Sequence, residues 1–209
     1  MDILGNQYNP SSPVPNLIGM QEGDVMAGVV TEPSGMDQFP IQVAQLHDQG
    51  KYGDYVDQTA NLNEVYESMQ EYFPTITGQS AILGNINKEA PSFNFMQREE
   101  GVELGGVGLF QFTNQHRDRY NKFIEDRDLN NSIDSQLKYV HDSIYGGGYN
   151  TEQMGGTNAK KIQQAFLGDD PVAASDMLLD RFFKPLKPED SRDDRRSFSQ
   201  NYYDQLSNL

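Results

Sequence analysis

Glu89 is the residue of this sequence whose type and setting best suit chemistry on a sugar. It ends an apolar, helix-like run in which Ile82, Leu83 and Ile86 recur at helical spacing. Cleavage of a glycosidic bond needs an acid that is still protonated near neutral pH, and burial beside apolar groups raises the pKa of a carboxyl group. Because Glu89 follows Ile86 by three residues, the spacing predicts that Glu89 lies at the edge of a buried helix face.

The run from Gly105 to Thr113, GGVGLFQFT, supplies the second half of the candidate site. Its three glycines let the backbone bend tightly and let a polymer approach it closely. Gln111 offers both a donor and an acceptor for a sugar hydroxyl or acetamido group. We therefore expect a helix-end carboxylate that faces a glycine-kinked apolar strand. On spacing alone, a solvated surface glutamate and an ordinary turn remain the alternatives.

Three further carboxylates lie between these two features. Residues 92–104 are expected to form a loop or short hairpin over a cleft, and this loop contains Glu99, Glu100 and Glu103. Each is a candidate second carboxylate that would orient water or stabilise positive charge on the sugar. The alternative for each is a position in a solvated acidic loop.

Composition excludes several classes of function. The chain has 209 residues, a formal net charge of −15 and no cysteine. This negative charge argues against binding to nucleic acid or to anionic lipid, although not against a polysaccharide substrate. With three histidines at no metal-ligand spacing, neither a zinc site nor a cofactor is expected.

Residues 1–60 differ from the rest of the chain. They hold five of the ten prolines, and Lys51 is their only basic residue. Prolines at such intervals forbid long helices and central strands, so we predict an extended arm that docks on a partner or on the chain's own domain. The N-terminus has no basic region followed by a long apolar run, so neither a secretory signal nor a membrane span is expected.

From residue 61 onward the pattern becomes helical, which predicts one domain over residues 61–209. Helices are predicted at about 61–73, 77–90, 114–126, 132–145, 157–167, 170–183 and 189–206. The charged start of the last one, DSRDDRR, reads as a solvated face. The expected fold is mostly α, with one short strand or hairpin beside the cleft, and the extended arm precedes this domain in the chain.

The order of these motifs resembles the phage tail lysozyme family, which is related in fold to goose-type lysozymes and lytic transglycosylases. The resemblance covers about residues 62–209 and is carried by Ile82-Leu83-Gly84-Asn85-Ile86 with Glu89, Gly108-Leu109-Phe110-Gln111-Phe112-Thr113, Asp134-Ser135-Gln136-Leu137-Lys138-Tyr139-Val140, Phe182-Phe183-Lys184-Pro185, Arg192 and Tyr202-Tyr203.

The resemblance implies a virion-associated peptidoglycan hydrolase that cuts the β-1,4 glycan of the bacterial wall during genome ejection. Glu89 would be the general acid, Gln111 and Thr113 would bind sugar, and Phe112 or Tyr139 would floor a subsite. Tyr139 is equally well explained as a core aromatic. The protein would reside in the tail or interior of the particle, with residues 1–60 docked on other virion proteins, and would act in the host periplasm.

Two departures from the family pattern support an alternative function. Glu89 is followed by Ala90-Pro91 where the family usually has serine, and Phe112 stands where it usually has tryptophan. The alternative is a lysozyme fold with weak or no activity, kept as a structural part of the particle.

Overall fold

The computed structural model describes residues 41, 55–99, 105–146, 156–185 and 187–209. Contacts divide the chain into two units, Met1–Met36 and Asp37–Leu209, and every described residue belongs to the second. Most of the predicted arm therefore lies outside the described residues. The same holds for a short helix that the sequence allows at 39–49 and for the glycine-rich segment after Gly146. Ile41 is an exception, because it is fully buried and its backbone bonds to the side chain of Asn63 on the first described helix.

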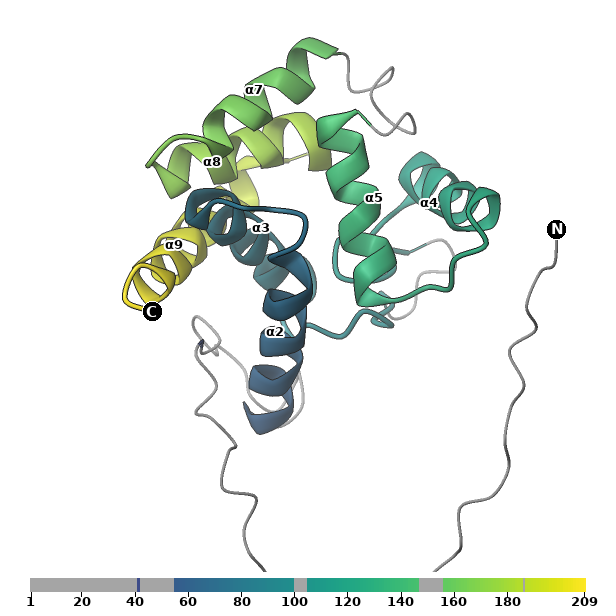
Figure 1. Ribbon diagram of the computed structural model, residues 1–209, viewed down its shortest axis with the longest axis horizontal. Coiled ribbons are helices and arrows are strands. Elements are labelled where there is room, and N and C mark those ends of the chain that lie inside the picture. The colour runs from purple at the N-terminus through teal and green to yellow at the C-terminus, as the bar shows by residue number, and fades with distance from the viewer. Residues whose placement is uncertain (1–40, 42–54, 100–104, 147–155, 186) are drawn as a thin grey trace, which may run out of the picture. The chain divides into compact units, whose positions relative to one another are not determined.

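Helices dominate the second unit, as predicted (Figure 1). In chain order they are α2 (Tyr55–Met69), α3 (Ile76–Glu89), α4 (Asn114–Asp126), α5 (Ile133–Tyr145), α7 (Gly156–Phe166), α8 (Pro171–Leu178), the π-helical turn η1 (Leu179–Phe183) and α9 (Glu189–Leu206).

The helix that ends in Glu89, α3, forms the centre of the core. Its residues from Thr77 to Asn87 are all buried, and it packs against α9, α8, α7 and α2. Gly84 allows α3 and α9 to pack closely, since a Cβ atom at this position would lie 2.6 Å from the backbone nitrogen of Ser199 on α9. Burial of α3 on several sides fixes the position of its last residue.

Side-chain caps explain why several helices begin where they do. The Ser132 hydroxyl accepts from the backbone N–H of Ser135 at the start of α5, and Asp170 caps α8 with Pro171 as the first helical residue. α3 begins at Ile76, one residue earlier than predicted, because the Thr75 side chain caps it by accepting from Gly78 N–H. Gly146 ends α5 in the left-handed conformation (φ 106°).

Two features of the predicted fold differ from the structure. The chain is already helical from Tyr55, where a polar linker was predicted up to residue 60. No strand of more than one residue occurs among the described residues. Instead, the run after Gly105 forms a turn between isolated antiparallel bridges, Arg98 to Val107 and Val107 to Phe112. Glycine at 108 with φ 77° turns the chain back too sharply for a longer ladder.

None of the helices in the described residues is long and apolar enough to cross a membrane.

Candidate active site

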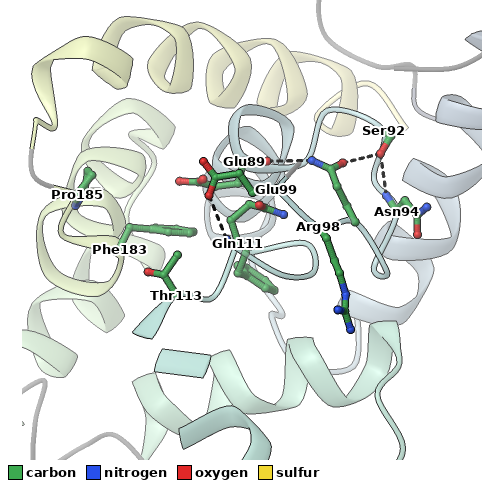
Figure 2. A pocket seen from close by; sticks show the side chains of 12 residues that line it. Glu89, Ser92, Asn94, Arg98, Glu99, Gln111, Thr113, Phe183 and Pro185 are labelled. Atoms are coloured by element: carbon green, nitrogen blue, oxygen red, sulfur yellow. Dashed lines mark hydrogen bonds between the residues drawn. The ribbon is translucent and has the colours of Figure 1, made fainter. Parts of the chain in front are cut away.

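A cleft of about 790 Å³ opens at the C-terminal end of α3 (Figure 2). It brings together residues from α3, the segment that follows it, the turn after Gly105 and the end of η1. The lining side chains that figure in the site are Glu89, Gln97, Glu99, Phe110, Gln111, Thr113, Phe183 and Pro185. In Figure 2, Phe183, Pro185 and Thr113 lie on one side of the cleft, and Ser92, Asn94 and Arg98 lie on the other.

Glu89, the last residue of α3, lies in this cleft and pairs with a buried arginine. Its Oε1 atom accepts a hydrogen bond from Nη2 of Arg195 on α9. The exposed fraction is 4% for the Arg195 side chain and 23% for that of Glu89. An acidic side chain at a helix C-terminus meets unfavourable partial charge from the helix carbonyls. The guanidinium offsets that cost, so the surroundings of Glu89 are cationic rather than purely apolar as the sequence predicted.

Arg195 is itself held by several groups. Nη1 donates to Oδ1 of Asn85 at 2.8 Å, and Nε donates to the hydroxyl of Ser191 at 3.1 Å. The guanidinium carbon lies 5.2 Å from the ring centroid of Phe183, which is within range of a cation–π contact. These bonds fix the guanidinium, and the guanidinium in turn fixes the Glu89 carboxylate.

The prediction that the charged start of α9 is a solvated face was therefore wrong for Arg195. The sequence signal was weak because the neighbouring Arg192 and Arg196 do lie nearer the surface, where both pair with Asp176 of α8. The helical period of α9 does place Arg195 on the buried face, because this residue precedes the buried Phe198, Tyr202 and Leu206 by three, seven and eleven residues.

Glu99 is the candidate second carboxylate that the structure places in the cleft. Its Oε2 accepts from the backbone N–H of Gly106 at 3.1 Å, and its own N–H donates to the Gly106 carbonyl at 3.0 Å. These two bonds fasten Glu99 to the turn opposite. Glu100 and Glu103 lie outside the described residues.

Gln111 lines the cleft from the tip of the turn in a strained conformation. Its φ is 44°, in the left-handed region, and its Nε2 donates to the carbonyl of Gly108 at 2.8 Å. A Cβ atom on residue 106 would lie only 2.5 Å from Oε1 of Gln111, so glycine at 106 makes room for the amide. Strained residues of this kind concentrate at functional sites.

A buried amide on α5 holds the turn in place. Gln136 accepts from the backbone N–H of Leu109 at 2.8 Å and donates to the carbonyl of Phe95 at 2.9 Å. Gly108 passes so close that a Cβ atom there would lie 2.4 Å from Gln136 Oε1. One side chain thus connects the turn with the segment on the other side of the cleft.

Thr113 also lines the cleft, whereas two predicted aromatic residues do not. Tyr139 is fully buried among Phe112, Tyr120 and Phe123, so its prediction as a subsite residue was wrong. Phe112 is 2% exposed, belongs to the same cluster and lines only a minor hollow beside the cleft. Phe110, which was not predicted as a site residue, borders the cleft, although its ring is also only 2% exposed.

His116, on the first turns of α4, lines that minor hollow. Burial, together with the positive charges of Arg119 and Lys184, lowers its pKa to about 4. It is therefore neutral at pH 7. Its ring packs against Phe182 with 5.4 Å between centroids. Within the described ranges no cluster of three or more histidine, cysteine or acidic side chains suits a metal ion.

Comparison with known proteins agrees with this geometry. A search of curated proteins gave no match. The model of the phage tail lysozyme family matches residues 60–206, which span α3, the turn and α9. This match covers well over half of the 209 residues. The chain belongs to the phage tail lysozyme family.

Proposed function

We propose that this protein cuts the β-1,4 glycan of bacterial peptidoglycan, with Glu89 as the general acid. The observation that carries the proposal is the setting of Glu89. It ends the most buried helix, lies in a cleft of about 790 Å³, and has one oxygen fixed by a buried guanidinium. Among the described residues its other oxygen, Oε2, has no hydrogen-bond partner and is the one that would face the scissile bond.

The proposed reaction starts with proton transfer from Glu89 to the glycosidic oxygen. As the bond breaks, positive charge develops on the sugar ring, and a nearby carboxylate stabilises it. Glu99, which lines the same cleft and is held by Gly106, would provide that charge or orient the attacking water. The attack on the sugar comes either from water or from a hydroxyl of the substrate itself.

The rest of the cleft suits an amino-sugar polymer. Gln111 and Thr113 offer polar groups, and the Thr113 hydroxyl makes no capping bond to α4. Phe183, which is partly exposed, offers aromatic surface for the apolar face of a sugar ring. A cleft with a few fixed polar groups on an aromatic lining is the usual form of a small-ligand site.

The family membership supports a role in a phage particle. We propose that the protein is a virion component that acts on the wall during genome ejection. In this account the docking arm is shorter than the predicted 1–60 and corresponds to the first unit, Met1–Met36, and the catalytic domain lies in the second unit, Asp37–Leu209.

One observation favours a second function. Glu89 forms an ion pair with an arginine that is buried between α3 and α9, and such a pair can also serve the packing of the two helices alone. The Glu89–Arg195 pair thus also fits a lysozyme fold that binds the wall as a structural component without cutting it.

The products released from purified peptidoglycan distinguish these functions. We expect soluble fragments in which the peptides stay attached to the sugars that carry them, with masses that correspond to cleavage between sugars. A gain of one water per cut indicates hydrolysis, and no gain indicates an anhydro sugar. Release of peptides without sugar would contradict glycan cleavage, and binding to the wall without release would favour the structural function.

A further inference from the structure

A second hollow, which we call the arginine groove, lies beside the cleft. It has a volume of about 280 Å³ and is lined by residues of the segment after α3, the turn, α4 and α5. The side chains that bear on its function are Met96, Arg98, Arg117, Asn121 and Asn131.

The charge of this groove is opposite to that of the protein. The chain has 31 acidic and 16 basic residues, yet the described residues that line the groove include two arginines and no acidic residue. Elsewhere in the described structure, Arg127, Arg192, Arg195 and Arg196 each pair with a carboxylate. Arg98 and Arg117 form no ion pair with any described residue. They are the cations that this groove offers to an acidic ligand.

The groove also has a fixed apolar surface. Met96 is 57% exposed, an unusual exposure for a large apolar side chain. Its sulfur accepts from Nδ2 of Asn131 at 3.4 Å, and Asn131 is held in turn by the hydroxyl of Tyr120 at 2.7 Å. Two cations beside an ordered apolar side chain suit a ligand with carboxylates and short aliphatic groups.

Arg98 connects the groove with the cleft, because it lines both. Figure 2 shows that its guanidinium points away from Glu89 and Glu99. A branch that leaves a polymer in the cleft would thus pass Arg98 and enter the groove.

We infer that the arginine groove binds the peptide stems of peptidoglycan, with Arg98 and Arg117 pairing with their carboxylates. The glycan carries such stems on alternate sugars, and each stem combines free carboxylates with small aliphatic side chains. This inference rests on the proposed function, because it takes the glycan to lie in the cleft.

Direct binding tests the groove independently of cleavage. The probe is a synthetic stem tetrapeptide with free carboxylates, titrated into the full chain by calorimetry at low salt. Charge-assisted hydrogen bonds justify an expected loss of about tenfold in affinity for Arg117→Gln. Lys122→Gln is the matched control, because Lys122 lies on the same helix and pairs with Asp126 away from the groove. The same peptide with its carboxylates amidated should bind at least about tenfold more weakly to the parent chain.

Cleavage of two substrates gives the second readout. For peptidoglycan with intact stems, we expect Arg117→Gln to raise KM about tenfold at unchanged kcat. For glycan from which an amidase has removed the stems, parent and variant should have the same KM.

The outcomes separate this inference from the proposed function. Equal affinity for the free and the amidated peptide, or an equal rise of KM on both substrates, would overturn the inference and leave glycan cleavage untouched. Peptide binding that depends on Arg117 in a chain that cuts nothing would support the groove and contradict the proposed function.

Discussion

At the scale of single residues, the pairing of Glu89 with Arg195 distinguishes this site from a carboxyl group surrounded by apolar side chains. Arg195 binds Oε1 of Glu89 and is itself held by Asn85 and Ser191. We interpret Arg195 as a positioning residue that fixes the acid without touching substrate.

Substitution Arg195→Gln tests this interpretation. Removing one partner of a buried ion pair leaves Glu89 and Asn85 without their donor, which justifies a loss of about 3 kcal/mol in the free energy of unfolding. We expect cleavage to fall as well, with the larger effect on kcat because the acid is no longer oriented. The measurements are denaturant unfolding and release of soluble wall fragments.

Arg196→Gln provides the comparison, since Arg196 lies next in the chain and pairs with Asp176 nearer the surface. It should change stability far less and leave cleavage unchanged. An Arg195→Gln chain with the parent kcat would show that Arg195 does not position the acid.

At the scale of elements, the contact of α3 with α9 carries the site, because Glu89 lies on one helix and Arg195 on the other. Gly84 sets their separation. A Cβ atom there would meet Ser199 backbone atoms at 2.6 Å and 2.8 Å, and backbone cannot rotate out of the way.

Gly84→Ala should therefore push the two helices apart and lower the free energy of unfolding by about 2 kcal/mol, as overpacking does. Gly156→Ala is the control, because a Cβ atom at that position, the first residue of α7, has no neighbour within 4 Å. Thermal unfolding measures both. A Gly84→Ala chain as stable as the control would contradict the packing described here.

The helices were predictable from the sequence because each carries its own period and boundary signals. α9 was predicted at its observed bounds, and Asp170-Pro171 marked the start of α8. The turn after Gly105 was harder to predict. Its conformation depends on the distant Gln136, and the left-handed backbone of Gln111 leaves no sequence signal. Burial of Tyr139 and Phe112 likewise arises from the packing of the turn against α4 and α5, which the helical period of each segment does not show.

At the scale of the whole molecule, the protein carries a net negative charge and the arginine groove carries positive charge. This difference would affect how the protein binds an anionic polymer. A net charge of −15 repels an anionic wall polymer at long range, and salt screens this repulsion over about 10 Å. Specific recognition then depends on short-range contacts in the cleft and the groove. In the proposed function the cleft would supply the acid and the sugar contacts, and the groove would supply the cations for the stems.

The most direct test of the account is the rate of glycan cleavage by Glu89→Gln, which keeps the size of the side chain and removes its proton. Since general acid catalysis contributes about 10²–10⁴ in rate, we expect release of wall fragments to fall at least about a hundredfold. Loss of the charge that faces the buried Arg195 should also lower the melting temperature, so the rates are compared at a temperature where the variant is folded. Glu64→Gln, an exposed position on α2, is the control and should keep the parent rate. A folded Glu89→Gln chain that cuts peptidoglycan at the parent rate would contradict the assignment of Glu89 as the acid.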